Sequence, residues 1–218
     1  MKNLSIVEKY TLLTLNDKGT FPSLSTNYPE ACLLSSAISD LSLNEVISID
    51  DKKMVTVVAD LPENLELLRP FYDYLKDIGS LSIAKILQDY TMSFSKRYEE
   101  LFQSISNSLA AKNSVEKEEK SGIIIDKVRY YPNKSDVESV VQKLRDEVLE
   151  KDKVSNDMLI LSSILDRGKQ LNQFFSKHES KDLKEKLELL RKTEASSLVK
   201  TMIDQLDALI VAMASISG

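Results

Sequence analysis

The sequence PEACLLSSAISDLSLNEVISID, residues 29–50, combines the two patterns that set the fold. Pro29 suits the first turn of a helix, and apolar residues then recur at intervals of three and four, which is the spacing of one helical face. VISID is rich in β-branched residues, and MVTVV follows after a short charged turn. We therefore predict a helix that leads into a small β-hairpin. The apolar helical positions are Ala31, Leu34, Ala37, Ile38 and Leu41.

Helical spacing also dominates the sequence on the N-terminal side of this stretch and just after the hairpin. Ser5 and Glu8 form a capping box, the arrangement in which each residue satisfies a backbone amide of the other. Gly19 provides a stop signal, so we expect the first helix to end shortly before it. Pro70 interrupts a later helical pattern, which predicts a break near Arg69.

Further helices are predicted in the rest of the chain. Ser135 and Glu138 form a second capping box at the start of one of them. The last helical pattern is apolar over much of its circumference, which suits a helix at the centre of a bundle. This last pattern covers residues 198–213, and the others cover residues 94–109, 158–175 and 183–190.

These patterns predict the fold class and the domain organisation. The chain has 218 residues, of which 42% are hydrophobic, and this is enough to fill a core. Repeats, low-complexity tracts and linkers rich in proline or glycine do not occur. We predict a mainly α protein in which residues 1–218 form one compact helical bundle with short peripheral β-hairpins.

Charge and hydropathy limit which partners the chain can bind and in which cellular compartment we expect it. Acidic residues exceed basic ones by 15 to 10 up to Leu109, and the counts are 19 and 19 thereafter, so the chain as a whole does not attract phosphates. No stretch is long and apolar enough to span a bilayer, and the N-terminus lacks the pattern of a secretory signal. A single cysteine agrees with a reducing compartment. We expect a cytoplasmic protein that does not bind nucleic acid.

The residues that usually carry catalysis or metal binding are scarce. His178 is the only histidine and Cys32 is the only cysteine, and they are far apart, so no usual metal site can be assembled from them. We expect Cys32 to be a small buried residue and His178 to be solvated near a helix end. The glycines are too widely spaced for a phosphate-binding loop. We therefore predict a protein that is not an enzyme and that needs no metal or cofactor.

The stretch EEKSGIIIDKVRYYPN, residues 118–133, has three consecutive isoleucines after a charged run and a glycine. A buried strand or a contact with a partner subunit explains such a patch, and so does a loop that meets a membrane. Taken alone, the residues favour the buried or protein-contact explanation.

The order of the predicted elements resembles the Golgi phosphoprotein 3 family. The resemblance rests on LLTLNDKG at the end of the first helix, ACLLSSAISDL leading into VISID, a long helix, a hairpin with an apolar tip, VVQKLRDEVLE, and an apolar last helix. It implies a mostly helical single domain on the cytosolic face of membranes that recognises phosphatidylinositol 4-phosphate. The chain lacks the acidic N-terminal extension of the eukaryotic members, so it looks more like the short bacterial ones.

The resemblance implies a role for the isoleucines. In the family a hairpin, here at about residues 115–131, carries an apolar tip that dips into the bilayer. Ile123, Ile124 and Ile125 fall at that tip. Basic residues beside them can rest against anionic headgroups. With the resemblance, the membrane becomes the favoured explanation of this stretch.

The implied headgroup pocket is matched only in part. Phe21 stands where the family has a tryptophan, and Glu30 stands where it has an arginine. A pair of arginines on the long helix corresponds to positions near Glu99 and Phe102, and the closest basic residues are Lys96 and Arg97. We expect Phe21, Lys96 and Arg97 to be the headgroup residues, although a solvated helix face also explains the last two. The departures put recognition of that particular lipid in doubt.

Three hypotheses follow. The leading one is a peripheral membrane protein that binds anionic lipid or phosphoinositide headgroups and inserts the hairpin tip. An alternative is an assembly module that forms a homodimer through the hairpin. The third is a winged-helix nucleic-acid binder, with the helix that begins near Pro29 as its reading helix and Lys52 and Lys53 on its wing. The acidic first half argues against this third hypothesis.

Overall fold

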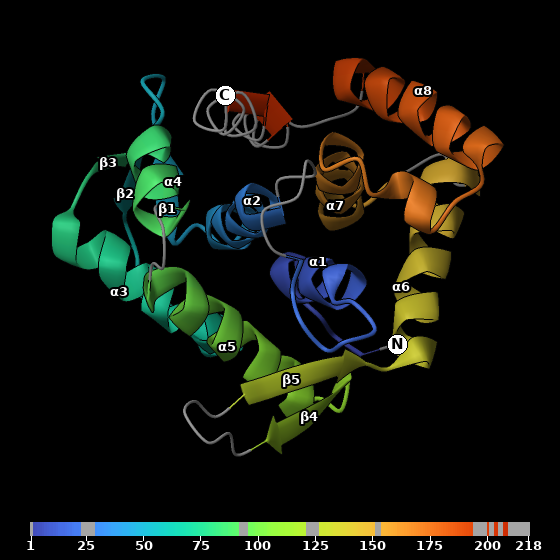
Figure 1. Cartoon of the computed structure of the whole chain (residues 1–218). Coiled ribbons are helices and arrows are strands. Elements are labelled where there is room, and N and C mark those ends of the chain that lie inside the picture. The colour runs from blue at the N-terminus through green and yellow to red at the C-terminus, as the bar shows by residue number, and fades with distance from the viewer. Residues whose placement is uncertain are drawn as a thin grey trace.

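The structure, a computed structural model, describes residues 2–22, 29–91, 96–120, 127–150, 154–193, 200, 203, 204, 207 and 208. In this part the chain is mainly helical, with two small antiparallel sheets at the periphery (Figure 1). The predicted mainly α class is therefore confirmed. The helices are α1 (Ile6–Thr14), α2 (Pro29–Leu43), η1 (Glu63–Leu68), α3 (Arg69–Ile78), α4 (Ile83–Thr91), α5 (Lys96–Ala111), α6 (Lys134–Arg145), η2 (Asp146–Glu150), α7 (Asn156–Arg167), η3 (Leu171–Gln173) and α8 (Lys177–Thr193). The strands are β1 (Ile47–Ile49), β2 (Met54–Val57), β3 (Leu81–Ser82), β4 (Val115–Lys120) and β5 (Lys127–Pro132).

Helices α1 and α2 lie at the centre of the molecule. Every residue of α1 is buried, and this helix packs against α2, α5, α6 and α7. Figure 1 shows α3, α4 and the three-stranded sheet on one side of this centre and α6 and α8 on the other. The C-terminal helical pattern at 198–213, predicted as central, lies largely outside the described residues.

Helix α1 begins at the predicted capping box, but Gly19 is not the residue that ends it. The Ser5 side chain accepts from the Glu8 amide at 3.4 Å, and the Glu8 carboxylate accepts from the Ser5 amide at 2.9 Å. The helix ends at Thr14, and Gly19 lies in a separate turn with φ of 69°. Asn16 organises that turn, because its side-chain oxygen accepts from the Lys18 and Thr20 amides.

The first hairpin and the proline break are confirmed. β1 and β2 pair antiparallel with Ser48 opposite Thr56, and β3 adds a third strand that we did not predict. The short β3 has only two residues and lacks a β-branched run, so propensity gives no signal for it. Pro70 lies in the first turn of α3, where its missing amide costs no helical hydrogen bond.

Helix boundaries differ from the prediction at α6, α7 and α8, and α8 spans Lys177–Thr193 instead of 183–190. Asn133, not Ser135, caps α6, and its side chain accepts from the Ser135 amide at 3.1 Å. The predicted helix over 158–175 ends at Arg167, because Gly168 follows and Lys169 adopts a positive φ of 55°. At Gly168 a Cβ would lie 3.0 Å from the Cys32 sulfur, so α2 and α7 approach closely here and a larger residue would press on Cys32.

Candidate functional site

The turn at residues 16–20 places Phe21 against the central helices. The Phe21 ring lies 6.2 Å from Tyr10 of α1, 6.3 Å from Tyr98 and 5.4 Å from Phe102, both of α5, measured between centroids. The contacts are edge-on or tilted, which are favourable arrangements of aromatic rings. Phe21 stays half-buried. The predicted headgroup residue is therefore a ring anchored in an aromatic cluster.

The same cluster reaches the base of the β4–β5 hairpin. Phe102 meets Tyr130 of β5 edge-on, with 5.9 Å between centroids. The Tyr130 hydroxyl donates to the Asn107 side chain at 3.2 Å, and the Tyr130 amide donates to the Gly19 carbonyl at 2.8 Å. The hairpin base and the turn that precedes Phe21 are thus in direct contact.

The electrostatic environment beside Phe21 is negative. Burial raises the pKa of the Tyr98 phenol well above its usual value, and the charge of Glu30 acts in the same direction. Burial likewise raises the pKa of the Cys32 thiol to about 12, again with a smaller contribution from Glu30. A negative charge at this place opposes the binding of a phosphate. Cys32 is fully buried, as predicted.

The structure places Arg97 on another side of α5. Its guanidinium lies over the Tyr74 ring of α3, 5.1 Å from the centroid, whereas Tyr98, the next residue, faces Phe21. The Tyr74 hydroxyl in turn donates to Asp89 at 2.8 Å. Lys96 is exposed at the first position of α5. The contacts thus group Phe21 with α5 aromatics and Arg97 with α3, and they do not bring these two predicted residues together.

The two strands of the hairpin pair along their whole length. β4 and β5 pair in register from Val115 opposite Pro132 to Lys120 opposite Lys127. Lys117 pairs with Glu119 at 2.7 Å, and the Tyr131 hydroxyl donates to Glu118 at 2.9 Å. The predicted insertion residues Ile123, Ile124 and Ile125 lie outside the described residues.

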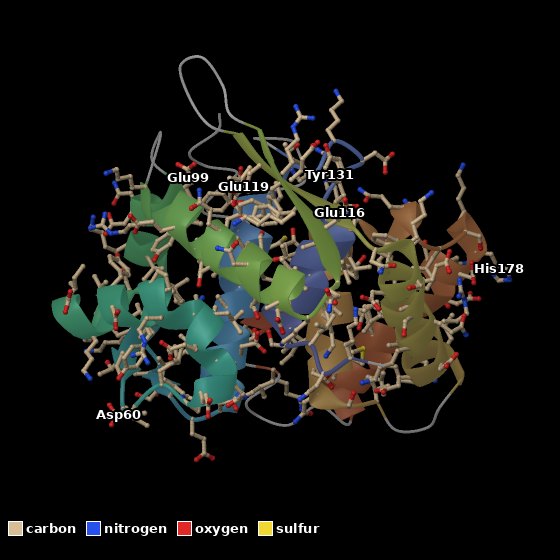
Figure 2. All side chains as sticks on the ribbon, turned by 90° about the horizontal axis from the view of Figure 1, so that it is seen from below. Asp60, Glu99, Glu116, Glu119, Tyr131 and His178 are labelled. Carbon is tan, nitrogen blue, oxygen red and sulfur yellow. The ribbon has the colours of Figure 1, made fainter. Side chains whose placement is uncertain are left out.

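Figure 2 shows the hairpin side of the molecule. Glu116, Glu119 and Tyr131 project from the strands, and Glu99 of α5 is exposed on this side. Glu99 lies near one of the two positions at which the resemblance implies an arginine. Together with Glu30, it makes the implied pocket acidic at two positions.

Sequence reasoning missed the role of Gly19 and Tyr130. Gly19 was interpreted as a helix stop, but it contacts β5, which is distant in sequence. The order Asn16, Asp17, Lys18, Gly19 is typical of a type I turn, with asparagine first and glycine last, and this signal indicates a turn separate from the helix. No local signal indicates the contact with Tyr130.

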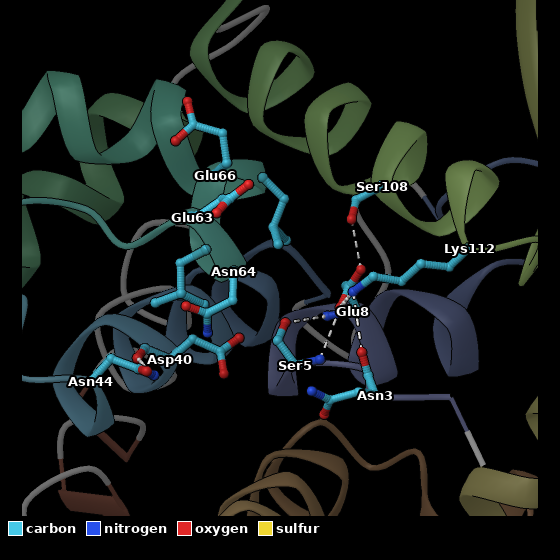
Figure 3. Close-up of a pocket in the computed structure, with 12 residues that line it drawn as sticks. Asn3, Ser5, Glu8, Asp40, Asn44, Glu63, Asn64, Glu66, Ser108 and Lys112 are labelled. Atoms are coloured by element: carbon cyan, nitrogen blue, oxygen red, sulfur yellow. Dashed lines mark hydrogen bonds and ion pairs between the residues drawn. The ribbon is translucent and has the colours of Figure 1, made fainter.

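A polar cavity of about 500 Å³ lies beside the start of α1 (Figure 3). The fully buried Glu8 accepts from Ser108 at 2.8 Å and from Lys112 at 2.7 Å. Asp40 of α2 accepts from the Ile6 and Val7 amides at 3.0 and 2.8 Å. Burial raises the pKa of Asp40 to about 6. The buried carboxylates of this cavity therefore satisfy the first turn of α1 and tie it to α5.

The described part of the chain contains neither a cluster of metal ligands nor a membrane-spanning helix. Its histidines, cysteines and acidic residues form no group of three that could hold a metal ion. None of its helices is both long and apolar enough to cross a bilayer. His178 is 86% exposed at the start of α8, in agreement with the prediction.

The reading helix of the winged-helix hypothesis is not accessible. α2 buries most of its polar side chains: Ser35, Ser36, Ser39 and Asp40 are each at most 5% exposed. A recognition helix must present such side chains to the major groove. The structure therefore argues against this hypothesis.

Comparison with known proteins gives one match over nearly the whole chain. The family model described as Golgi phosphoprotein 3 (GPP34) matches residues 6–206. No curated protein sequence matches the chain. The matched region includes α1, the aromatic cluster, the β4–β5 hairpin and α8. The resemblance predicted from the order of elements is confirmed.

Proposed function

Because the chain belongs to the Golgi phosphoprotein 3 family, we propose that it is a non-enzymatic peripheral protein of the cytosolic face of a membrane. It binds anionic lipid or phosphoinositide headgroups and inserts the apolar tip of the β4–β5 hairpin. The observation that carries the proposal is the register of this hairpin. The strands stay paired out to Lys120 and Lys127, so Ile123, Ile124 and Ile125 belong to the segment that joins the two strands.

The energies favour apolar insertion over charge attraction. Fully burying one isoleucine is worth about 1.5 to 3 kcal/mol, so three partly inserted ones supply several kcal/mol before ordering costs. A basic residue close to an anionic surface contributes about 1 kcal/mol. The two strands carry Lys117, Lys120, Lys127 and Arg129 against Glu116, Glu118 and Glu119, a net charge of only +1. The apolar tip therefore dominates the binding.

The headgroup is the finer part of the proposal. Family resemblance supports phosphatidylinositol 4-phosphate, with Phe21, Lys96 and Arg97 near the headgroup. Glu30 and Glu99 oppose it, because they place negative charges at positions that the resemblance assigns to arginines. A vesicle panel separates the two possibilities. It compares vesicles containing this lipid with vesicles of equal total charge that contain phosphatidylserine, and stronger binding to the former supports the specific headgroup.

Flotation with liposomes tests membrane insertion. We expect the wild-type chain to float with anionic vesicles and a variant with Ile123, Ile124 and Ile125 all changed to serine to stay in the soluble fraction. A matched control changes Val58, Ile78 and Leu189 to serine, because these apolar side chains are 59%, 49% and 58% exposed away from the hairpin. The control should float like the wild type. Equal flotation of all three proteins, or of none, contradicts insertion.

Assembly through the hairpin is a second candidate. In the described sheet β4 pairs with β5 alone, so the other edge of β4 offers backbone groups to a strand from a second copy. Light scattering tests this function on the wild type and on a variant in which residues 119–128 are replaced by an Asn-Gly turn. A dimeric wild type and a monomeric variant support assembly, whereas two monomers contradict it.

A further inference from the structure

The turn at residues 16–20 connects the two parts of the proposed membrane surface. It carries Phe21 immediately after it, and its Gly19 touches β5 of the hairpin. The turn is held internally by several hydrogen bonds. The Gly19 amide donates to the Asn16 carbonyl at 2.9 Å, and the Asn16 side-chain amide donates to the Thr20 hydroxyl at 2.9 Å. These hydrogen bonds restrict the conformation of the turn, so it forms a rigid connection.

Only a glycine fits at position 19. Its φ of 69° lies in the left-handed region, which a Cβ disfavours. A Cβ built there would lie 3.0 Å from the Arg129 Cβ, 3.1 Å from the Tyr130 nitrogen and 3.2 Å from the Tyr131 ring. Two of these three atoms belong to the backbone of β5 or are bonded directly to it. A Cβ at this position therefore requires β5 to shift by a few tenths of an ångström, in addition to straining the backbone of the turn.

The other side of the hairpin base is held by α5. Tyr130 packs on Phe102 and donates through its hydroxyl to Asn107, while its amide donates to Gly19. One residue of β5 is thus fixed by the turn through its backbone and by α5 through its side chain. Such a strand has a defined direction relative to the body of the molecule.

We infer that the 16–20 turn positions the hairpin for membrane contact, with Gly19 and Tyr130 as positioning residues. The inference rests on the proposed function. The turn and α5 hold the base of the hairpin beside Phe21. When the hairpin and Phe21 contact one membrane, the second contact therefore forms at a high effective concentration. A hairpin held in this way also avoids the entropy cost of ordering a mobile hairpin on binding.

The chain offers a matched control for Gly19. Gly79 also has a positive φ, of 86°, but a Cβ there would meet nothing within 4 Å. Gly19→Ala and Gly79→Ala therefore both strain the backbone, and only the first one displaces β5. Comparison of the two separates hairpin positioning from a general loss of stability.

The experiment has two readouts. Spin labels on cysteines introduced in place of Glu119 and His178, which are 68% and 86% exposed, report the hairpin-to-body distance in solution. The buried Cys32 stays unlabelled. We expect Gly19→Ala to shift or broaden the distance distribution and Gly79→Ala to leave it unchanged. On anionic vesicles we expect the unlabelled Gly19→Ala variant to bind at least about threefold more weakly than Gly79→Ala, as the lost coupling of two contacts requires.

The outcomes are distinguishable. An unchanged distance distribution in Gly19→Ala overturns the positioning role, whatever the vesicles show. A changed distribution with unchanged vesicle binding overturns its importance for membrane contact. A wild-type chain that does not bind vesicles overturns the proposed function and, with it, the membrane role of the turn, while the distance measurement still decides whether the turn holds the hairpin.

Discussion

At the scale of single residues, α1 carries two adjacent buried side chains of opposite charge, Glu8 and Lys9, which pair with different parts of the molecule. Glu8 pairs with Lys112, which directly follows α5, at 2.7 Å, and Lys9 pairs with Asp157 of α7 at 2.8 Å. Both α1 side chains are at most 6% exposed. Because the α1 side chain of each pair is buried, removing its partner leaves that charge uncompensated, which is destabilising. The central helix is thus joined by charge to both halves of the molecule.

Asp40 gives a residue-scale prediction about pH. Burial raises its pKa in the folded chain to about 6, against the ordinary 3.8 in the unfolded chain. Between these values the folded state binds the extra proton, so its contribution to stability grows as the pH falls from 7 to 4. Relative to Asp40→Asn, the wild type should gain about 2 to 3 kcal/mol in unfolding free energy over this range.

Urea unfolding of both proteins at a series of pH values provides the measurement. Comparison with Asp40→Asn removes the effects of other carboxylates, such as Glu147 and Asp157, whose lowered pKa values act in the opposite direction. A wild type that loses stability relative to the variant below pH 6 would mean that the two backbone amides, and not burial, control this carboxyl.

At the scale of elements, periodicity located the helices well and their ends less well. The predicted break at Pro70 and the helix beginning at Pro29 are observed because proline acts locally. Ser135 and Glu138 match a capping box, but the N-cap of α6 is Asn133, because β5 ends at Pro132 and the helix begins at Lys134. The helix over 158–175 was predicted too long, because an isolated glycine within a helical pattern is often tolerated. Here the helix ends at Arg167, with Gly168 as its C-cap and Lys169 at a positive φ.

The cap of α6 supplies the element-scale prediction. Asn133→Ala removes the acceptor for the Ser135 amide and should lower the unfolding free energy by about 1 kcal/mol. Ser135→Ala should cost less, because the Ser135 hydroxyl only donates to the Asn133 side chain. Denaturant titration of both variants checks the order of the two effects, and a larger loss in Ser135→Ala would restore the capping box predicted from sequence.

At the scale of the whole molecule, the mainly α class and the family could be predicted, whereas the arrangement of the candidate site could not. The order of helices and hairpins identified the family because it extends over the whole chain. The separation of Arg97 from Phe21 depends on which face of α5 meets α3, and the contact of Gly19 with Tyr130 joins residues far apart in sequence. Such long-range pairings leave no local pattern. The sequence therefore indicated candidate residues for the site but not how they are arranged in space.

The most direct test of membrane insertion uses the absence of tryptophan from the sequence. Ile124→Trp places a single tryptophan, whose emission can be excited separately from that of the tyrosines, in the segment that joins β4 to β5. If the hairpin tip enters the bilayer, anionic vesicles will shift its emission to the blue, and lipids brominated on their acyl chains will quench it. An emission spectrum that vesicles leave unchanged, with no quenching by brominated lipids, would contradict the central claim.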